Sequence, residues 1–205
     1  MLLPQIVLLL FDLLERLDIF YAVLKAIHLG INVLIYRAVS YTHLDVYKRQ
    51  GVLLHITSLP GRFGTGTLGA PAQLFLDFLA DAGFTAWQIL PVNPLGEGFS
   101  PYQSPASLGI NPLLLDPDIL VKNGLLLPEE LPACTDPEFV DYSYIAAEWD
   151  RMLMLATARS GEPNFAEAEF YRQWSSLQAY AHARGIEIIG DLPIYVAPNL
   201  SLIHI

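Results

Sequence analysis

The sequence predicts an α/β protein in which short buried strands alternate with helices. Apolar runs suited to buried strands occur at residues 51–59 and 85–92, and residues 185–197 predict a third strand. Segments with helical spacing of apolar residues separate them, and Gly or Pro bounds each run. Parallel strands joined by helices are typically buried on both faces of the sheet. By itself this alternation fits either a (β/α) barrel or an open doubly wound sheet.

The first two strands and the helix between them form a βαβ unit. GVLLHITSL (51–59) is stopped by a Pro-Gly turn signal, and TAWQILPV (85–92) is the second apolar run. In PAQLFLDFLADAG (71–83), Pro71 suits the first helical position and Gly83 suits the C-terminal cap. We therefore expect a helix over residues 71–83.

The third strand follows a long irregular region. Residues 93–117 are dense in Gly, Pro, Ser and Asn, but their apolar content predicts an ordered loop of the kind that carries function. We interpret the acidic stretch after this loop as a connection. The spacing within residues 167–185 then predicts an amphipathic helix, with these side chains near one stripe: Phe170, Trp174, Leu177 and Tyr180. Residues 185–197 are expected to form the third strand.

Charge and cysteine content exclude several classes of protein. Residues 51–199 hold 6 Lys plus Arg and 17 Asp plus Glu, a net charge of 6 − 17 = −11, so no nucleic-acid partner is expected. Cys134 is the only cysteine, which rules out an intramolecular disulfide or a thiolate metal cluster and favours a reducing, cytoplasmic location. Charged residues interrupt the apolar segment 1–37, so no membrane partner is expected. We expect no metal and no cofactor.

Two unlike hexapeptides mark the expected limits of the natural protein. DVYKRQ (45–50) and LSLIHI (200–205) can be translated from the two strands of one oligonucleotide, since GATGTGTATAAGAGACAG reverse-complements to CTGTCTCTTATACACATC. This sequence resembles a transposase-end adapter used in sequencing libraries. We expect residues 1–50 to be foreign or artefactual, residues 51–199 to be a partial barrel, and residues 200–205 to be an adapter-like tail.

A glycine motif raises the alternative of a dinucleotide-binding α/β domain. Gly64, Gly66 and Gly69 spell G-x-G-x-x-G between a strand and a helix. In a dinucleotide site, however, the first glycine turns the chain directly after the strand. Here Pro60 to Phe63 intervene, and the second strand ends without an acidic residue for the ribose. These glycines are better interpreted as shaping a tight surface loop.

Three longer blocks resemble the 4-α-glucanotransferases of glycoside hydrolase family 77, also called amylomaltases or disproportionating enzymes. They are HITSLPGRFGTGTLG (55–69), WQILPVNPLGEGFSPYQSPASLGINPLLLD (87–116) and IIGDLPIYVA (188–197). The resemblance implies the N-terminal portion of a (β/α)8 TIM barrel with long insertions, incomplete in this chain. It further implies transfer of α-1,4-glucan segments between maltooligosaccharides by a retaining double displacement, which needs two carboxyl groups.

The resemblance also implies which residues contact the substrate. Asp191 follows the third strand, and Tyr102 lies in the S-P-Y-Q-S loop, where an aromatic ring with a polar hydroxyl suits a sugar. Ser100 and Gln103 are further candidates, although ordinary turn hydrogen bonds also explain them. The family's nucleophile and acid/base follow later strands, so we expect no catalytic residue in this chain and no activity from it. The alternative is a non-catalytic maltooligosaccharide-binding fragment.

Three other residues receive structural interpretations. We expect His55, on the first strand, to be a hydrogen-bonded core histidine rather than a catalytic one. Trp87 alternates with apolar neighbours on the second strand and is expected to pack in the core. Asn111 precedes a proline and is expected either to close the binding loop or to start a turn.

Overall fold

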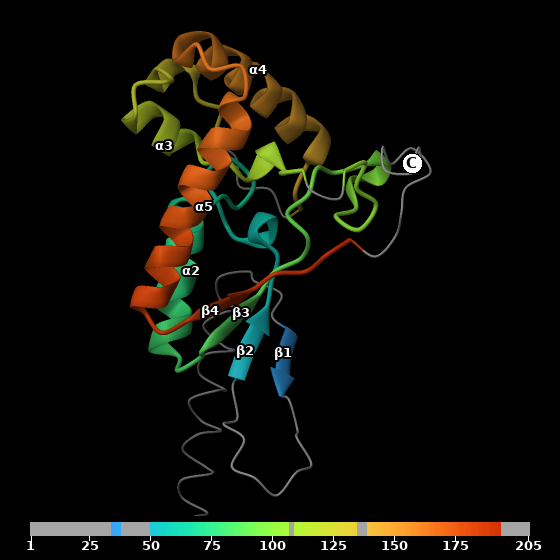
Figure 1. Ribbon diagram of the computed structural model, residues 1–205, viewed down its shortest axis with the longest axis vertical. Coiled ribbons are helices and arrows are strands. Elements are labelled where there is room, and N and C mark those ends of the chain that lie inside the picture. The colour runs from blue at the N-terminus through green and yellow to red at the C-terminus, as the bar shows by residue number, and fades with distance from the viewer. Residues whose placement is uncertain (1–33, 38–49, 107–108, 135–138, 194–205) are drawn as a thin grey trace, which may run out of the picture.

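A four-stranded sheet with helices packed beside it organises the chain. The structure is a computed structural model that describes residues 34–37, 50–106, 109–134 and 139–193. Strand order is β1-β2-β3-β4, with β1 antiparallel to β2 and the remaining pairs parallel (Figure 1). The strands are β1 Leu34–Arg37, β2 Gln50–Leu53, β3 Ala86–Gln88 and β4 Glu187–Ile189.

Helices α2 and α5 lie side by side next to the sheet, as Figure 1 shows, and span Ala70–Asp81 and Phe165–Ala183. Trp87 of β3 is fully buried in the apolar cluster that they share with the strands. Its ring meets Phe75 of α2 edge to face, with centroids 5.1 Å apart, and its Nε1 donates to the Leu54 carbonyl at 2.8 Å. The expectation that Trp87 packs in the core is confirmed.

Helix α2 and helix α5 both follow their predicted patterns. Pro71 lies in the first turn of α2, and Gly83 just beyond its end has φ +77°, the left-handed conformation that favours glycine there. On α5, Phe170 and Leu177 are buried, while Trp174 and Tyr180 are partly buried against the same cluster. The expected apolar stripe is therefore the face that α5 turns toward the core.

A second apolar cluster underlies the helices α3 (Pro117–Lys122) and α4 (Tyr142–Ser160). The interpretation of the stretch after the long loop as an acidic connection is wrong, because the stretch contains α4, a helix of 19 residues. Asp141 caps its start by accepting from the Tyr144 amide at 3.0 Å, and Gly161 ends it with φ +68°. The buried side of α4 carries Ile145, Trp149, Met152 and Ala156.

The strands are shorter than their apolar runs predict. After β2 the chain turns into a 3₁₀ helix at Ile56–Ser58, and the Ser58 amide donates to the His55 carbonyl. Residues 90–92 and 190–193 also lie outside the strands, and residues 194–197 of the third run lie outside the described residues. Further 3₁₀ turns occur at η2 Glu97–Phe99, η3 Pro112–Leu114 and η4 Pro128–Glu130.

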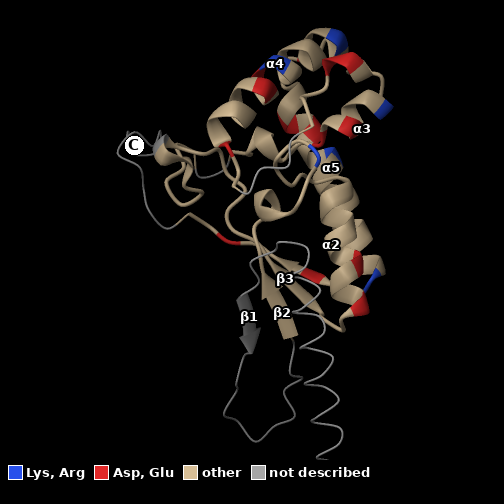
Figure 2. Cartoon of the chain, turned by 180° about the vertical axis from the view of Figure 1, so that it is seen from behind, with Lys and Arg blue, Asp and Glu red and all other residues tan. Residues whose placement is uncertain are grey.

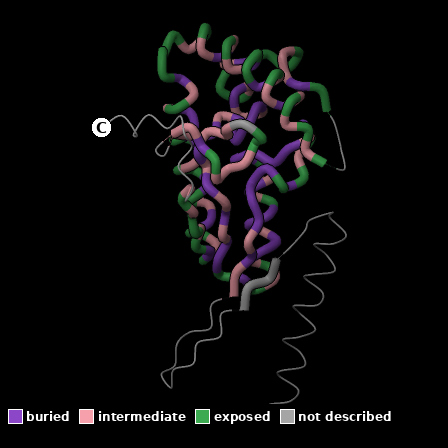
Figure 3. The backbone as a smooth tube through the Cα atoms, turned by 90° about the vertical axis from the view of Figure 1, so that its right-hand side faces the viewer, coloured by how far each residue is buried: buried purple, intermediate pink, exposed green. Residues whose placement is uncertain are grey.

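Charged residues lie mainly on the helices, and the strands β2 and β3 carry none (Figure 2). Buried residues concentrate in β3 and on the inner sides of the helices (Figure 3). The sheet is covered unevenly, because both end residues of β4, Glu187 and Ile189, are exposed. Within the described part of the chain, no helix combines the length and apolar character needed to cross a membrane.

The expected domain limits remain a prediction. β1 belongs to the segment that we expect to be foreign, yet it pairs with β2 in the register Leu34 to Leu53. Gln50, the last residue of the adapter-like hexapeptide, is the first residue of β2, and its carbonyl accepts from the Thr85 amide at 3.0 Å. The rest of residues 1–49 and the tail 200–205 lie outside the described residues.

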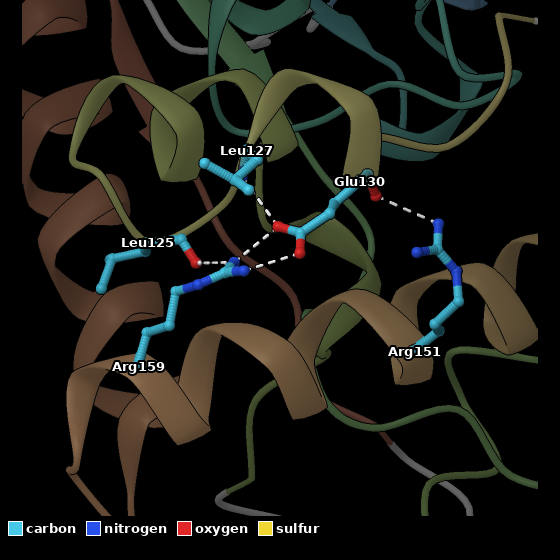
Figure 4. Close-up of polar contacts among 5 residues, drawn as sticks. All are labelled: Leu125, Leu127, Glu130, Arg151 and Arg159. Atoms are coloured by element: carbon cyan, nitrogen blue, oxygen red, sulfur yellow. Dashed lines mark hydrogen bonds and ion pairs between the residues drawn. The ribbon is translucent and has the colours of Figure 1, made fainter.

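An ion pair anchors η4 to α4 (Figure 4). Both guanidinium Nη atoms of Arg159 donate to the Glu130 carboxylate, at 2.5 and 2.6 Å. The Leu127 amide donates to the same carboxylate at 2.8 Å, and Arg151 donates to the Glu130 carbonyl at 3.1 Å. Hydrogen bonds from Arg159, followed by the one from the Leu127 amide, lower the pKa of Glu130 to about 2.

Candidate functional site

A tyrosine and an aspartate from distant parts of the sequence meet beyond the carboxyl ends of the parallel strands. Tyr102 lies in the loop after β3, and Asp191 lies two residues after β4. The Tyr102 hydroxyl donates to Oδ2 of Asp191 at 2.7 Å. The amide of Leu192 donates to the other carboxylate oxygen, Oδ1, at 2.8 Å. Both predicted residues are therefore brought together, and each oxygen of the carboxylate is oriented by a hydrogen bond.

The electrostatics of this pair assign a donor and an acceptor. The hydrogen bond to Asp191 is the largest cause that raises the pKa of the Tyr102 phenol above its ordinary value, followed by burial and by the charge of the carboxylate. Tyr102 therefore keeps its proton at neutral pH. Both side chains are only partly buried, so the pair can offer hydrogen-bonding groups to a polar ligand.

Ser100 and Gln103 form the turn that carries Tyr102. The Tyr102 amide donates to the Ser100 hydroxyl at 3.4 Å, and the Gln103 amide donates to the Ser100 carbonyl at 3.2 Å. A Cβ atom on Gly96 would lie 2.0 Å from the Gln103 carbonyl oxygen, so only glycine fits there. The Ser100 side chain thus serves the turn, and the Gln103 side chain is exposed.

The same loop is attached to the protein farther along the chain. Asn93 donates from Nδ2 to the Ala106 carbonyl at 3.0 Å, and the buried Ser104 hydroxyl donates to that carbonyl at 2.8 Å. The backbone amide of Asn111 donates to the Val92 carbonyl at 2.7 Å. The side-chain oxygen Oδ1 of Asn111 accepts from the Leu113 amide at 3.1 Å. Asn111 therefore both closes the loop onto the residues after β3 and caps the η3 turn.

His55 differs from the expectation in two respects, because it lies beyond the end of β2 and one of its ring nitrogens is not hydrogen-bonded to any described residue. It is buried, as expected of a core histidine, but its Nδ1 has no hydrogen-bond partner among the described residues. Burial lowers the pKa of His55 to about 4, because an apolar environment disfavours the charged imidazolium. His55 is therefore neutral at physiological pH and lies two residues after β2, at the same end of the sheet as Tyr102 and Asp191.

The glycine motif does not form an open phosphate-binding loop. Gly66 donates its amide to the Thr57 carbonyl at 3.3 Å, so this amide is already used. A Cβ atom on Gly69 would lie 2.1 Å from Oδ2 of Asp116. A carboxylate at that position would repel a pyrophosphate. A Cβ atom on Gly66 would lie 2.0 Å from the Ile56 carbonyl oxygen, so this glycine packs against neighbouring backbone instead. The dinucleotide-binding alternative is inconsistent with this geometry.

Among the described residues, no group of three or more His, Cys, Asp or Glu side chains is placed to hold a metal ion. Asp116, the carboxylate beside the glycine loop, is buried and caps α3 by accepting from the amides of Asp118 and Ile119. It also accepts from the Thr67 hydroxyl at 2.5 Å. These contacts give Asp116 a structural role.

Fold and site together define an α/β protein whose polar residues gather beyond the carboxyl ends of parallel strands, where such proteins place their ligands. Residues 54–168 and 163–201 match the protein family described as 4-alpha-glucanotransferase. The chain belongs to this family.

Individual relatives agree with the family match. The chain is 34% identical over 217 residues to the 4-alpha-glucanotransferase of Synechocystis sp., covering 72% of this chain and 43% of that protein. It is 34% identical over 221 residues to the Thermus thermophilus enzyme, covering 76% and 44% of the two chains. The chain thus spans less than half the length of these curated relatives.

A solved structure shows the same fold. The amylomaltase from Streptococcus agalactiae in complex with acarbose superposes with a TM-score of 0.60 at 27% sequence identity. The superposition covers 75% of this chain and 46% of the amylomaltase chain. The mixed α/β architecture with a parallel β2-β3-β4 sheet is therefore that of part of an amylomaltase.

Proposed function

We propose that this chain forms one side of the glucan-binding site of a 4-α-glucanotransferase. In this proposal β2, β3 and β4 are the first three strands of a (β/α)8 barrel, and the site lies at their carboxyl ends. The hydrogen bond between Tyr102 and Asp191 carries the proposal. It combines an aromatic ring, which suits the apolar face of a glucose unit, with a carboxylate that accepts from sugar hydroxyls.

Asp191 serves in binding rather than as the nucleophile in this proposal. Retaining glycosyl transfer needs two carboxyl groups about 5 Å apart across the scissile bond. One oxygen of Asp191 accepts from Tyr102 and the other from the Leu192 amide. These bonds fix the orientation of the carboxylate, whose oxygens can accept further hydrogen bonds from sugar hydroxyls. We propose that the nucleophile and the acid/base are not among residues 51–199, so that the chain binds glucans without transferring them.

Maltooligosaccharides or other α-1,4-glucans are the proposed ligands. The likeness to the Streptococcus agalactiae amylomaltase, solved in complex with acarbose, supports this class of ligand. The acidic balance of residues 51–199, a net of 6 − 17 = −11, supports a neutral or cationic ligand over a phosphorylated one. The single cysteine supports a reducing, cytoplasmic location.

Calorimetric titration of the 205-residue chain with maltotetraose and with acarbose tests this function. Tyr102→Ala is expected to weaken binding at least about tenfold, because it removes the ring and the hydroxyl together, whereas Tyr102→Phe should lose less. Tyr171→Ala, a tyrosine exposed on α5, is the matched control and should bind like the wild type. No binding of either sugar by the wild type, or equal binding by Tyr102→Ala, contradicts the proposal.

Two further titrations separate the alternatives. Saturable binding of NAD would restore the dinucleotide-binding interpretation, and no heat from NAD is expected. Incubation with maltotriose, followed by chromatography, is expected to give no longer and shorter glucans. Products from the wild type that disappear in Asp191→Asn would show that the chain transfers glucans, which contradicts the binding-only part of the proposal.

A further inference from the structure

The residue three positions before Tyr102 has an unusual backbone conformation. Phe99 has φ +58°, and it is the one non-glycine residue with positive φ in the part of the chain that the structure describes. The left-handed region disfavours bulky side chains, so a residue held there must be stabilised by its surroundings. Gly98, just before it, has φ +80°. The chain therefore bends sharply immediately before the turn that carries Tyr102.

An aromatic stack joins Phe99 to the start of α4. The ring of Phe99 lies on the ring of Tyr142, with centroids 5.3 Å apart and an interplanar angle of 16°. Tyr142 is the first residue of α4, and its hydroxyl lies 3.0 Å from the hydroxyl of Thr57. Thr57 is buried in the 3₁₀ turn after β2. The stack thus connects the loop after β3 both to α4 and to the residues after β2.

We propose that Phe99 and Tyr142 are positioning residues that hold Tyr102 against Asp191. The turn from Ser100 to Gln103 is closed by its own hydrogen bonds, so it moves with Phe99 as a unit. A shift of the Phe99 ring away from Tyr142 therefore carries the Tyr102 hydroxyl away from the Asp191 carboxylate. The role in sugar binding rests on the function proposed above, whereas the positioning of Tyr102 does not.

This arrangement gives α4 a role in positioning the loop after β3, although α4 lies far from that loop in the sequence. Tyr142 lies 40 residues after Tyr102 in the sequence, and α4 packs mainly on the second apolar cluster. Through the Phe99 ring and the Thr57 hydroxyl, the first residue of α4 joins the strand ends that carry the site. The second cluster then supports the geometry of the site as well as its own fold.

The titration of Tyr102 provides a readout that general stability would not move. In the full chain carrying ¹³Cζ-labelled tyrosine, the Tyr102 signal is identified by its loss in Tyr102→Phe. The wild-type phenol is expected to titrate above the ordinary tyrosine pKa, because Asp191 accepts its hydrogen bond. In Phe99→Ala, the pKa of Tyr102 is expected to fall back toward the ordinary value, and maltotetraose binding to weaken about tenfold.

Matched variants complete the experiment. Phe139→Ala removes a phenylalanine that is 78% exposed and should leave both the Tyr102 pKa and binding unchanged. Tyr142→Phe keeps the stacked ring and loses only the contact with Thr57, so both effects should be smaller and in the same direction. The Tyr102 pKa decides the positioning proposal even if the wild type binds no sugar, which would contradict the proposed function alone. An unchanged Tyr102 titration in Phe99→Ala and Tyr142→Phe overturns the positioning proposal.

Discussion

Two regions of the molecule are stabilised by different kinds of contact: the sheet with α2 and α5, and the loop after β3. Around Trp87 the contacts are apolar and fully buried, and they join β3 to α2. Around Tyr102 they are partly exposed hydrogen bonds, and the one to Asp191 spans 89 residues of sequence. The first region should determine whether the chain folds, and the second should determine whether it binds. Stability and binding are therefore separable in this molecule.

Replacing Trp87 tests the buried side of this comparison and should have the largest effect. Trp87→Ala removes a fully buried ring together with the hydrogen bond to the Leu54 carbonyl, and it should lower the free energy of unfolding by about 3–5 kcal/mol. Urea denaturation monitored by circular dichroism measures this change. Leu74→Ala, at a residue 68% exposed on α2, should change it by less than about 0.5 kcal/mol. Similar effects of both variants would argue against a packed core around Trp87.

The pH dependence of stability tests whether His55 is buried and neutral in the folded chain. His55 has its pKa lowered to about 4 from 6.5, so between these values the unfolded chain binds a proton that the folded chain does not. The free energy of unfolding should therefore fall as the pH drops from 6.5 to 4, by on the order of 3 kcal/mol from this group. Denaturation at several pH values, compared with His55→Gln, measures the difference. Parallel curves for the two proteins would contradict a buried, neutral His55.

Tyr102→Phe sharpens the comparison from the side of the loop. It removes one partly exposed hydrogen bond and keeps the ring, so the free energy of unfolding should fall by only about 0.5–1 kcal/mol. Maltotetraose binding should be affected more strongly than stability. Urea denaturation and calorimetric titration of the same preparation give both values. A stability loss as large as that of Trp87→Ala would show that the loop belongs to the folding core.

The Glu130 ion pair should have the smallest effect at neutral pH, because solvent screens it. Its carboxylate has a folded pKa of about 2, below the ordinary value of 4.5. Its stabilisation is therefore present above pH 4.5 and is lost as the pH falls toward 2. Glu130→Gln should be less stable than the wild type at pH 7, and the difference should shrink at high salt and vanish near pH 2. Glu129→Gln, at the exposed neighbour, should show a smaller dependence.

Local patterns were most informative where side chains repeat along one face. The helical spacing and glycine ends predicted α2 and α5, and the apolar run predicted that Trp87 is buried. Helix α4 was missed because its acidic residues suggested a connection. Its start and end signals were nevertheless present in Asp141 and Gly161, and its buried residues follow helical spacing.

The candidate site could be predicted only in part. The motif resemblance predicted Tyr102 and Asp191, which a hydrogen bond joins in the structure. Nothing in the local sequence indicated that Phe99 adopts positive φ or that its ring meets Tyr142. The orphaned Nδ1 of His55 was equally hidden. Each of these features depends on which side chains surround a residue, and the chain path sets those neighbours.

By itself, the sequence determined the alternation of strands and helices, the family and the residues that we propose for sugar binding. These follow from periodicity and turn chemistry, which act over a few neighbouring residues, and from motifs that can be recognised without coordinates. Only the tertiary structure decided that Gly69 of the glycine motif packs against Asp116 and that α4 contacts the loop that carries Tyr102 through Tyr142. Such contacts join residues far apart in the chain, and their geometry is set by how the strands and helices pack against one another.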